Sequence, residues 1–542
     1  MSPQNGKSVL IIIPPYFDIN DLVPNNLSTK LPVVTIPYGV LSLASYVTAY
    51  SKFTVKFNIL DLNMEILKII EKESRDINYE IKKLIKNYMD ESKPDIVGIS
   101  ALFNTSFDYL EIVSNSVKNI NSKTLVLIGG GLATNLYSEV LSTFKNIDAA
   151  CYGEGEIPLL NLVDSPSPQD YIRSSKNWIS RQSISEGIVP LHSFVENLDD
   201  IPFFDYSLID IESYGGRALD RSSPSNSQQE LSIHTSRGCP FNCVFCSNGK
   251  VHGKTVRHMS VEKVTNDVAM MKTNWAMHTL LIEDDHFLSD KKRAKIILKH
   301  FIEYKIKIEF PNGMAIYAID DEIGHLLQVA GVKTVSLAVE SGSDFVLKNI
   351  IDKPLRVSMV KPAVDILKKH NINVHAFFVI GLPGELESHR DETMQLISDV
   401  GFDWVYFFLA IPVAGSRLYE ICKENGYLIS DSFSRHIITK GNIRAPGIDP
   451  EYMEQKAYFM NLEANFVNNN NIRTGHYEKA LPYYESIVEK YPHHAFAHYY
   501  LAECYERLKI TTEKVTTHRE SFYKLTSSDE KWNHYSKYFK LI

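Results

Sequence analysis

Residues 232–246 read SIHTSRGCPFNCVFC, and the rest of the chain is arranged around this stretch. It contains three cysteines, Cys239, Cys243 and Cys246. A short apolar, β-prone run leads into the loop that carries them, and Gly238 and Pro240 flank the first cysteine. Such turn-forming residues let three thiolates converge instead of being buried separately. Three converging thiolates indicate a metal centre.

The spacing Cys-x3-Cys-x2-Cys narrows the kind of centre. It fits neither a pair of Cys-x2-Cys zinc knuckles nor the four-cysteine runs of ferredoxins. Three sulfur ligands leave one iron of a four-iron cubane open, and an open iron can chelate a substrate or a cofactor. A zinc site completed by His252 and a chance grouping of thiols are the alternatives.

The segment TSRGCPFNCVFC, with Phe245 directly before the last cysteine, resembles the cluster motif of the radical S-adenosylmethionine (SAM) superfamily. The resemblance implies that Cys239, Cys243 and Cys246 are the catalytic, metal-binding residues and hold a [4Fe-4S] cluster. It also implies that the open iron binds SAM, and that reduction cleaves SAM to a 5'-deoxyadenosyl radical. Phe245 is then expected beside the bound cofactor.

Composition excludes several classes of protein. The 542 residues, 44% hydrophobic and 23% charged, indicate a soluble globular protein of two to four domains. The net charge of −8 and scattered Lys and Arg argue against a nucleic-acid partner. No apolar run is long enough for an integral membrane segment. Three singleton cysteines, expected as buried thiols, favour a reducing, cytoplasmic compartment: Cys151, Cys422 and Cys504.

Residues 1–165 alternate short apolar runs with longer amphipathic segments. This pattern predicts a doubly wound α/β domain with a parallel sheet, which binds ligands beyond the carboxyl ends of its strands. The expected strands are 9–13, 56–60, 96–100, 125–128 and 149–152. The expected helices are 39–49, 66–88, 107–119 and 138–144.

Small and polar residues follow three of these strands, in the segments Ser100-Ala-Leu102, Gly129-Gly130-Gly131 and Gly153-Glu154-Gly155-Glu156. Together with Pro37-Tyr38-Gly39, they resemble the cobalamin (B12) binding domain found ahead of some radical SAM domains. The cobalamin-binding residues that this implies are Tyr38, Gly39, Ser100, Leu102, Gly129, Gly130, Gly153 and Glu154. A nucleotide-binding or vestigial Rossmann-like domain is the alternative.

The chain departs from the usual cobalamin domain in one respect. Such domains present an Asp-x-His-x-x-Gly loop whose histidine coordinates cobalt, yet no histidine precedes His192 here. The resemblance therefore implies base-off cobalamin with no protein histidine ligand. The loop from Tyr16 to Pro37 is expected along the lower face, with Tyr16, Phe17 and Asp18 as candidates to approach cobalt.

A Ser-, Pro- and Asn-rich linker is predicted over 166–227, followed by a radical SAM domain over 228–430. Six strand-helix units predict a partial (βα)6 barrel, with its chemistry at the carboxyl ends of the strands. The expected strands are 231–235, 279–283, 306–310, 333–339, 373–380 and 404–410. The expected helices lie near 261–273, 290–304, 320–330, 357–370, 388–400 and 416–425.

Three of these strand ends resemble SAM-binding segments. The candidates for SAM contact are Asp284, Asp285, Glu340, Ser341 and Gly381. Helix caps for the acidic residues and a tight turn at the glycine are the alternatives. His375 and Tyr406 are further candidates on the substrate side, with a structural histidine and a core aromatic as the alternatives.

Residues 431–542 form a predicted α-helical region with one tetratricopeptide-like (TPR-like) repeat around Ala480. It is expected either to cap the barrel or to bind a protein or peptide partner.

The order of domains implies a cobalamin-dependent radical SAM enzyme. The resemblance favours transfer of a methyl group to an unactivated carbon, by way of methylcobalamin and the 5'-deoxyadenosyl radical. It implies a small-molecule, lipid or peptide substrate and an electron donor of the flavodoxin or ferredoxin type. A radical cyclase or rearrangement enzyme, similar to the anaerobic magnesium-protoporphyrin ester cyclase, is the alternative. A cobalamin or redox sensor that signals through the helical tail is the non-enzyme alternative.

Overall fold

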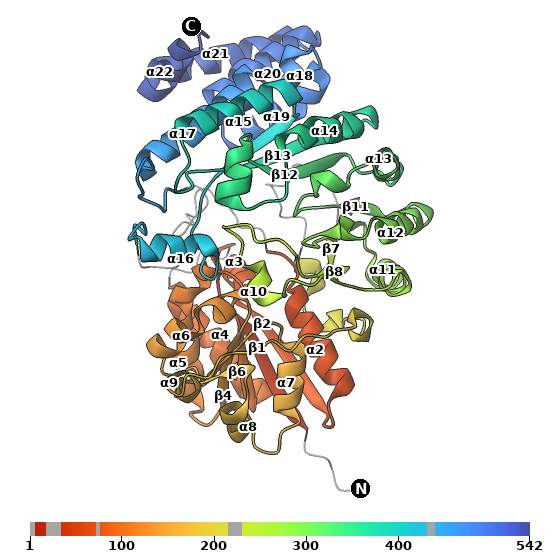
Figure 1. Ribbon diagram of the computed structural model, residues 1–542, viewed down its shortest axis with the longest axis vertical. Helices are drawn as coiled ribbons and strands as arrows, with labels where there is room; N and C mark the ends of the chain where they lie inside the picture. The colour runs from red at the N-terminus through yellow and green to blue at the C-terminus, as the bar shows by residue number, and fades with distance from the viewer. Residues whose placement is uncertain (1–5, 18–33, 72–75, 215–229, 431–439) are drawn as a thin grey trace. The chain divides into compact units, whose positions relative to one another are not determined.

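The computed structural model describes residues 6–17, 34–71, 76–214, 230–430 and 440–542 (Figure 1). The chain forms two compact units. The first comprises Met1–Asn312, Val329–Val332 and Ile411–Ile437, and the second Gly313–Gln328, Lys333–Ala410 and Ile438–Ile542. The predicted domain boundaries at 165, 227 and 430 stay predictions.

A six-stranded sheet in the order β2-β1-β3-β4-β5-β6 begins the first unit. Its strands are β1 (Lys7–Ile13), β2 (Val55–Asp61), β3 (Ile96–Ser100), β4 (Leu125–Gly129), β5 (Ala149–Cys151) and β6 (Trp178–Ile179). The first five pair in parallel, and β6 pairs antiparallel to β5. The order 2-1-3-4-5 is a doubly wound order, which places the ligand-binding crevice at the carboxyl ends of the strands.

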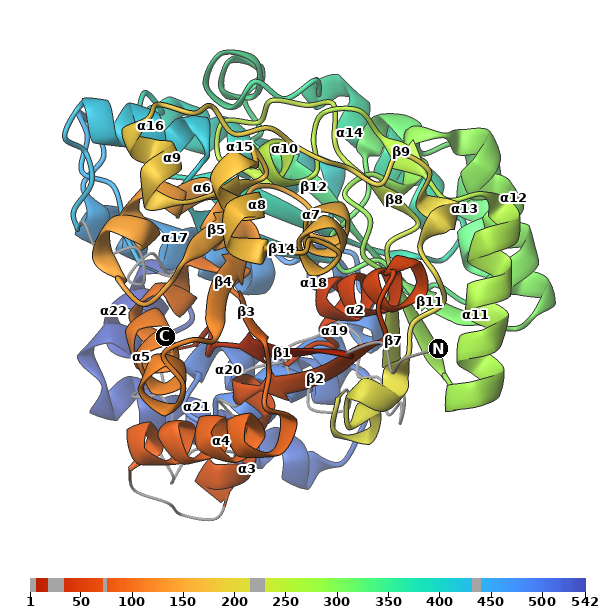
Figure 2. The ribbon, with the colours of Figure 1, turned by 90° about the horizontal axis from the view of Figure 1, so that it is seen from below.

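Helices cover both faces of this sheet (Figure 2). They are α2 (Tyr38–Tyr50), α3 (Leu62–Glu71), α4 (Ile77–Ser92), α5 (Leu110–Ile120), α6 (Gly131–Thr143) and α7 (Glu156–Val163). Helices α3 to α6 share one hydrophobic core with the sheet. Helices α2 and α7 contact each other on the opposite face.

Several expected elements of this domain differ from the structure in their bounds, and the helices expected over 66–88 and 138–144 differ most. The helix expected over 66–88 is two helices, because the Asp76 side chain accepts a hydrogen bond from Tyr79 N–H and starts α4 anew. Helix α6 begins at Gly131 instead of 138, because Gly130 (φ +98°) turns the chain directly after β4. The fifth strand ends at Cys151, one residue early.

The segment expected as a linker is ordered through Tyr214, and residues 215–227 lie outside the described ranges. It contains α8 (Pro168–Ser174), α9 (Arg181–Ser185) and the unexpected strand β6. The Trp178 indole N–H donates to Pro158 O at 3.0 Å and anchors β6 at the sheet edge.

The first unit also holds a parallel sheet in the order β11-β10-β7, formed by β7 (Glu230–Ile233), β10 (Thr279–Ile282) and β11 (Lys307–Glu309). The strand expected over 231–235 ends at Ile233. Ser236–Arg237 instead form β8, which pairs antiparallel with β9 (Arg257–His258) and closes the cysteine loop. The helices here are α10 (Asn248–Val251), α11 (Val261–Trp275), α12 (Lys291–Glu303) and α16 (Arg417–Glu424).

The second unit is built on a parallel sheet of β12 (Thr334–Glu340), β13 (Asn373–Ile380) and β14 (Trp404–Leu409). Its helices include α13 (Asp321–Val329), α14 (Val360–Lys369) and α15 (Glu387–Val400). The six strands expected after residue 228 are therefore present as two three-stranded sheets.

The tail helices are α17 (Pro450–Leu462), α18 (Asn470–Arg473), α19 (Tyr477–Lys490), α20 (Ala495–Arg507), α21 (Thr512–Ser528) and α22 (Glu530–Tyr538), drawn in blue in Figure 1. They share a hydrophobic core with Trp404 of β14. The Trp404 ring stacks on Tyr483 of α19, with centroids 5.2 Å apart and planes 5° apart. The tail is thus packed onto the sheet of the second unit.

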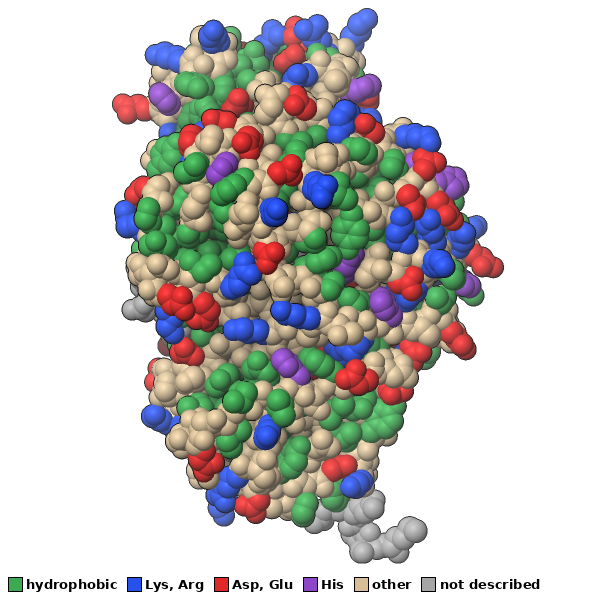
Figure 3. Space-filling model, viewed as in Figure 1, with side chains coloured by type: hydrophobic (Ala, Val, Ile, Leu, Met, Phe, Trp, Pro, Cys, Tyr) green, Lys and Arg blue, Asp and Glu red, His purple; other side chains and the backbone are tan. Residues whose placement is uncertain are grey.

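Charged side chains of both signs are interspersed over the face drawn in Figure 3. Within the described ranges, every helix is too short or too polar to cross a bilayer.

Candidate functional site

The cysteine loop runs between β8 and β9 in the first unit. Gly238 (φ +96°) lets the chain turn, and a Cβ at this position would lie 2.4 Å from Thr255 O. The Cys239 N–H donates to Gly253 O at 3.4 Å, and the Cys246 N–H donates to Cys243 O at 3.0 Å. Cys239 and Cys243 are partly exposed and Cys246 is exposed. The loop therefore offers three accessible thiols.

The three thiols of this loop are donors of the type that hold iron-sulfur clusters. In the ranges that the structure describes, no three His, Cys, Asp or Glu side chains are gathered tightly enough to hold one metal ion. A four-iron cubane does not need such a gathering, because each thiolate binds a different iron. His252, the fourth ligand of the zinc alternative, lies with its Nδ1 2.9 Å from Glu154 Oε1.

Asp284, directly after β10, contacts the start of the cysteine loop. This carboxylate is 3% exposed and accepts hydrogen bonds from Thr235 N–H (2.5 Å), Thr235 Oγ1 (2.6 Å) and Ser236 Oγ (2.7 Å). Burial raises the pKa of Asp284, and the bonds from Ser236 and Thr235 limit the rise. Asp285 is exposed and accepts a hydrogen bond at 2.6 Å from the Nδ2 of Asn248, which lies in the loop two positions after Cys246. The two aspartates thus hold the two sides of the cysteine loop.

A cavity of about 340 Å³ opens at the carboxyl ends of the six-stranded sheet. All eight residues with an expected role in cobalamin binding line it, namely Tyr38, Gly39, Ser100, Leu102, Gly129, Gly130, Gly153 and Glu154. Because ligand sites range from about 300 to 1,000 Å³, this volume suits a nucleotide-sized group.

Sequence reasoning missed two parts of the cavity wall. The apolar part includes Val9, Ile11, Leu43, Leu127 and Leu159. In strands that are apolar throughout, side chains that face a cavity and side chains that face the core look alike. The polar part includes His234, Arg237 and His252, which come from beyond the first predicted domain. Histidines therefore reach this cavity although none precedes residue 192.

The outer part of the cavity wall carries apolar side chains. Leu102 is 61% exposed and Phe103 is 50% exposed, and the Phe103 ring lies edge-on to Tyr16, with centroids 5.2 Å apart. Burial raises the pKa of Tyr16. Phe17 packs against the core, and Asp18 lies outside the described residues.

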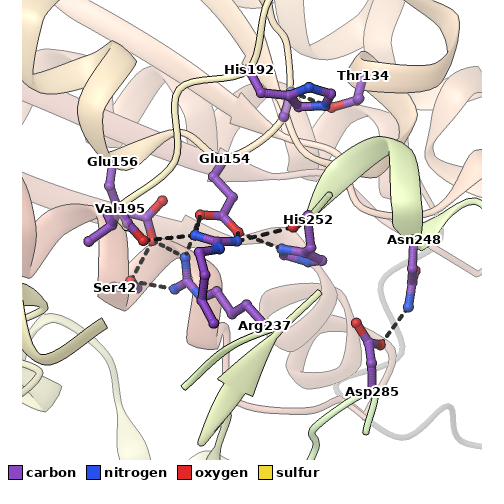
Figure 4. Close-up of polar contacts among 12 residues, drawn as sticks. Ser42, Thr134, Glu154, Glu156, His192, Val195, Arg237, Asn248, His252 and Asp285 are labelled. Carbon is purple, nitrogen blue, oxygen red and sulfur yellow. Dashed lines mark hydrogen bonds and ion pairs between the residues drawn. The ribbon is translucent and has the colours of Figure 1, made fainter. Parts of the chain in front are cut away.

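Glu154 occupies the centre of a buried polar network (Figure 4). Its carboxylate lies 3.3 Å from Arg237 Nη1, accepts from Arg257 at 3.0 and 2.6 Å, and contacts His252 at 2.9 Å. Burial alone would raise the pKa of Glu154, but Arg237, His252 and Arg257 outweigh it and hold this pKa well below its usual range. The carboxylate is therefore ionised.

The other candidates for SAM contact lie in the second unit. Glu340 ends β12 with φ +70° and pairs with Lys353 Nζ at 3.0 Å, and Ser341 is buried beside it. A positive φ on a glutamate is a strained backbone of the kind that gathers at functional sites. The Gly381 N–H donates to Glu385 Oε2 at 2.6 Å. Glu385 is buried, and sequence reasoning passed over it although it follows the same glycine-rich turn.

His375 contacts the tail. It is fully buried, and its Nε2 lies 2.7 Å from Tyr483 Oη. Tyr406 lies beside it, with ring centroids 5.8 Å apart. The contact with Tyr483 supports the structural role for His375.

We expect the second unit to lose stability in acid through His375. Burial lowers the pKa of His375 to about 4. The unfolded chain takes up this proton near pH 6.5, so stability falls by about 1.4 kcal/mol per pH unit between pH 6.5 and 4. Unfolding midpoints of the wild type and of His375→Gln across this range measure the effect. Equal pH slopes in the two proteins would show that His375 does not titrate in this way.

Parts of the chain match two known protein families, and the chain is similar in sequence to known methyltransferases. Residues 233–397 match the radical SAM superfamily, and residues 27–163 match the B12 binding domain. The chain is 28% identical to an uncharacterised methyltransferase of Pyrococcus horikoshii, over 68% of this chain and 78% of that protein. It is 26% identical to the cytidylyl-2-hydroxyethylphosphonate methyltransferase of Streptomyces wedmorensis, over 80% of this chain and 87% of that one.

Among solved structures, the fold is similar to that of the cobalamin-dependent SAM radical enzyme OxsB. The TM-score is 0.64 at 13% identity, covering 97% of this chain and 80% of OxsB.

Proposed function

Because the chain belongs to the cobalamin-dependent radical SAM superfamily, with a B12-binding domain ahead of a radical SAM domain, we propose that it transfers a methyl group to an unactivated carbon. Two curated relatives with methyltransferase names support this reaction. One observation carries the proposal: Arg237, two positions before Cys239, and His252, in the part of the loop after Cys246, both line the cavity at the sheet edge. In this proposal the two cofactor sites are therefore adjacent.

Each site has a defined role in this proposal. When bound, the [4Fe-4S] cluster and SAM supply a radical that removes hydrogen from the substrate, and cobalamin supplies the methyl group. The three cysteine thiolates hold the cluster, and Asp284 fixes the start of their loop. The cavity holds the nucleotide part of cobalamin. Phe245, Asp285, Glu340, Ser341 and Gly381 are proposed to contact SAM.

The surroundings of the cobalt are proposed to lack a protein ligand. Leu102 and Phe103 offer apolar groups at the outer part of the cavity. His252 is engaged by Glu154, and the His234 Nε2 lies 3.6 Å from Glu283 Oε2. These contacts favour cobalamin with no histidine ligand from the protein, and the base-off state of the cofactor is a further part of the proposal.

Several finer features belong to the same proposal. The radical SAM domain is proposed to be a partial barrel, and the TPR-like tail either caps the barrel or binds a partner. A flavodoxin or ferredoxin type donor supplies the electron, in a reducing, cytoplasmic compartment. The buried thiols of Cys151, Cys422 and Cys504 favour such a compartment. The substrate is a small molecule, a lipid or a peptide.

Anaerobic reconstitution with iron, sulfide and cobalamin, followed by incubation with SAM and a reductant, tests the proposal. We expect the purified protein to retain cobalamin, and SAM to yield S-adenosylhomocysteine only when cobalamin is present. Absorbance spectra measure retention, and chromatography measures the product. If the protein retains no cobalamin, or forms S-adenosylhomocysteine equally well without it, the proposed cobalamin-dependent methyl transfer is refuted.

A further inference from the structure

A single carboxylate contacts both flanks of the cysteine loop. Arg237 lies two positions before Cys239, whereas His252 and Arg257 follow Cys246 in the chain. All three side chains meet Glu154, whose side chain is 2% exposed. Figure 4 shows Arg237 and His252 beside this carboxylate. The Arg257 pair is bidentate, which fixes orientation as well as distance. Glu154 therefore links the segment before the three cysteines to the segment after them.

The charges in this network are paired and buried. Arg237 also contacts Glu156 Oε1 at 2.9 Å and donates to Ser42 Oγ at 3.0 Å. Arg257 donates a hydrogen bond to Val195 O at 2.8 Å, and its guanidinium carbon lies 4.4 Å from the centroid of the Phe194 ring. Buried ion pairs add little stability over apolar residues of equal size, and in some proteins they specify one arrangement. This network is suited to fixing the position of the loop.

The backbone beside Glu154 forms a wall of the cavity. Gly153, Glu154 and Gly155 all line it. The Gly153 N–H donates to Thr134 Oγ1 at 3.1 Å, which ties this turn to α6. A group in the cavity therefore meets the backbone of a segment whose side chain holds the cysteine loop.

We propose that Glu154 is a positioning residue that couples occupation of the cavity by cobalamin to the ordering of the cysteine loop around its cluster. The coupling rests on the proposed function, because it needs both cofactors. A coupling free energy is reciprocal, so a cluster that orders the loop tightens cobalamin binding by the same factor. Couplings between sites commonly reach about 5- to 150-fold.

Titration of hydroxocobalamin, followed by absorbance, tests the coupling without an activity assay. The Kd is measured for the chain with and without its assembled cluster, in the wild type, in Glu154→Gln and in Asp148→Asn. Asp148 is the matched control, because it pairs with Lys118 and caps Val126 N–H in the same unit. We expect the cluster to tighten binding about 5-fold or more in the wild type and in Asp148→Asn. In Glu154→Gln the two Kd values should agree.

Equal Kd values in the wild type, or an undiminished ratio in Glu154→Gln, would overturn the coupling while leaving the methyltransferase in place. Absence of cobalamin binding altogether would instead refute the proposed function. If circular dichroism shows that Glu154→Gln is unfolded, Arg257→Lys replaces it. Lysine keeps the positive charge but cannot form the bidentate pair with Glu154. The ratio of the Kd without the cluster to the Kd with it should therefore fall in this variant too.

Discussion

Replacing Cys239, Cys243 and Cys246 together by alanine should abolish iron binding and reduce deoxyadenosine formation to background. The three thiols lie on one accessible loop between β8 and β9, and a [4Fe-4S] cluster has no other anchor in the proposal. Cobalamin should still bind, because the cavity is lined mainly by the six-stranded sheet and its helices, but about 5-fold or more weakly, since the cluster that tightens its binding is missing. Iron analysis and absorbance spectra measure both quantities on the same sample.

Cys422→Ala is the matched control for this variant. Cys422 is a buried thiol of α16 outside the loop, so its removal should leave iron content unchanged. Iron binding or deoxyadenosine formation by the triple variant would overturn the cluster assignment.

Gly129→Phe should weaken cobalamin binding by about 10- to 100-fold, whereas Gly129→Ala should bind normally. Gly129 ends β4 and lines the cavity, and a Cβ there would meet only Cys151 Cβ among its near neighbours, at 3.8 Å. The methyl group of an alanine therefore fits, whereas the phenyl ring of a phenylalanine would fill space in the cavity that cobalamin occupies in the proposal. Overpacking of this kind costs about 1–3 kcal/mol, and each 1.4 kcal/mol is tenfold in affinity.

Iron content of samples reconstituted without cobalamin serves as the control in the glycine variants, since it should equal that of the wild type in both. Unchanged cobalamin affinity in Gly129→Phe would place cobalamin outside this cavity.

Local patterns were sufficient to predict most elements. The expected strands 96–100 and 373–380 coincide with β3 and β13, because β-branched and aromatic runs bounded by turn residues have few other structures. The split between α3 and α4 was missed because Asp76 looks like any polar residue of an exposed helical face. The short strand β6 was missed because two residues form no pattern.

The site was predictable only in part. The cysteines and glycines lie in short segments with distinctive spacing. The partners of Glu154 lie up to 103 positions away in the chain, and no local pattern indicates such a contact. Likewise, the acidic segment after β10 drew attention to Asp284, but its bonds to Thr235 and Ser236 depend on the pairing of β10 with β7.

The two products of SAM, measured together, test the central claim most directly. The reconstituted enzyme, incubated anaerobically with SAM, cobalamin and a reductant, should form both deoxyadenosine and S-adenosylhomocysteine, because the proposed reaction uses one SAM as the source of the radical and another as the source of the methyl group. Deoxyadenosine without S-adenosylhomocysteine would indicate a radical cyclase or rearrangement enzyme. Absence of both products would contradict the assignment as an enzyme of this class.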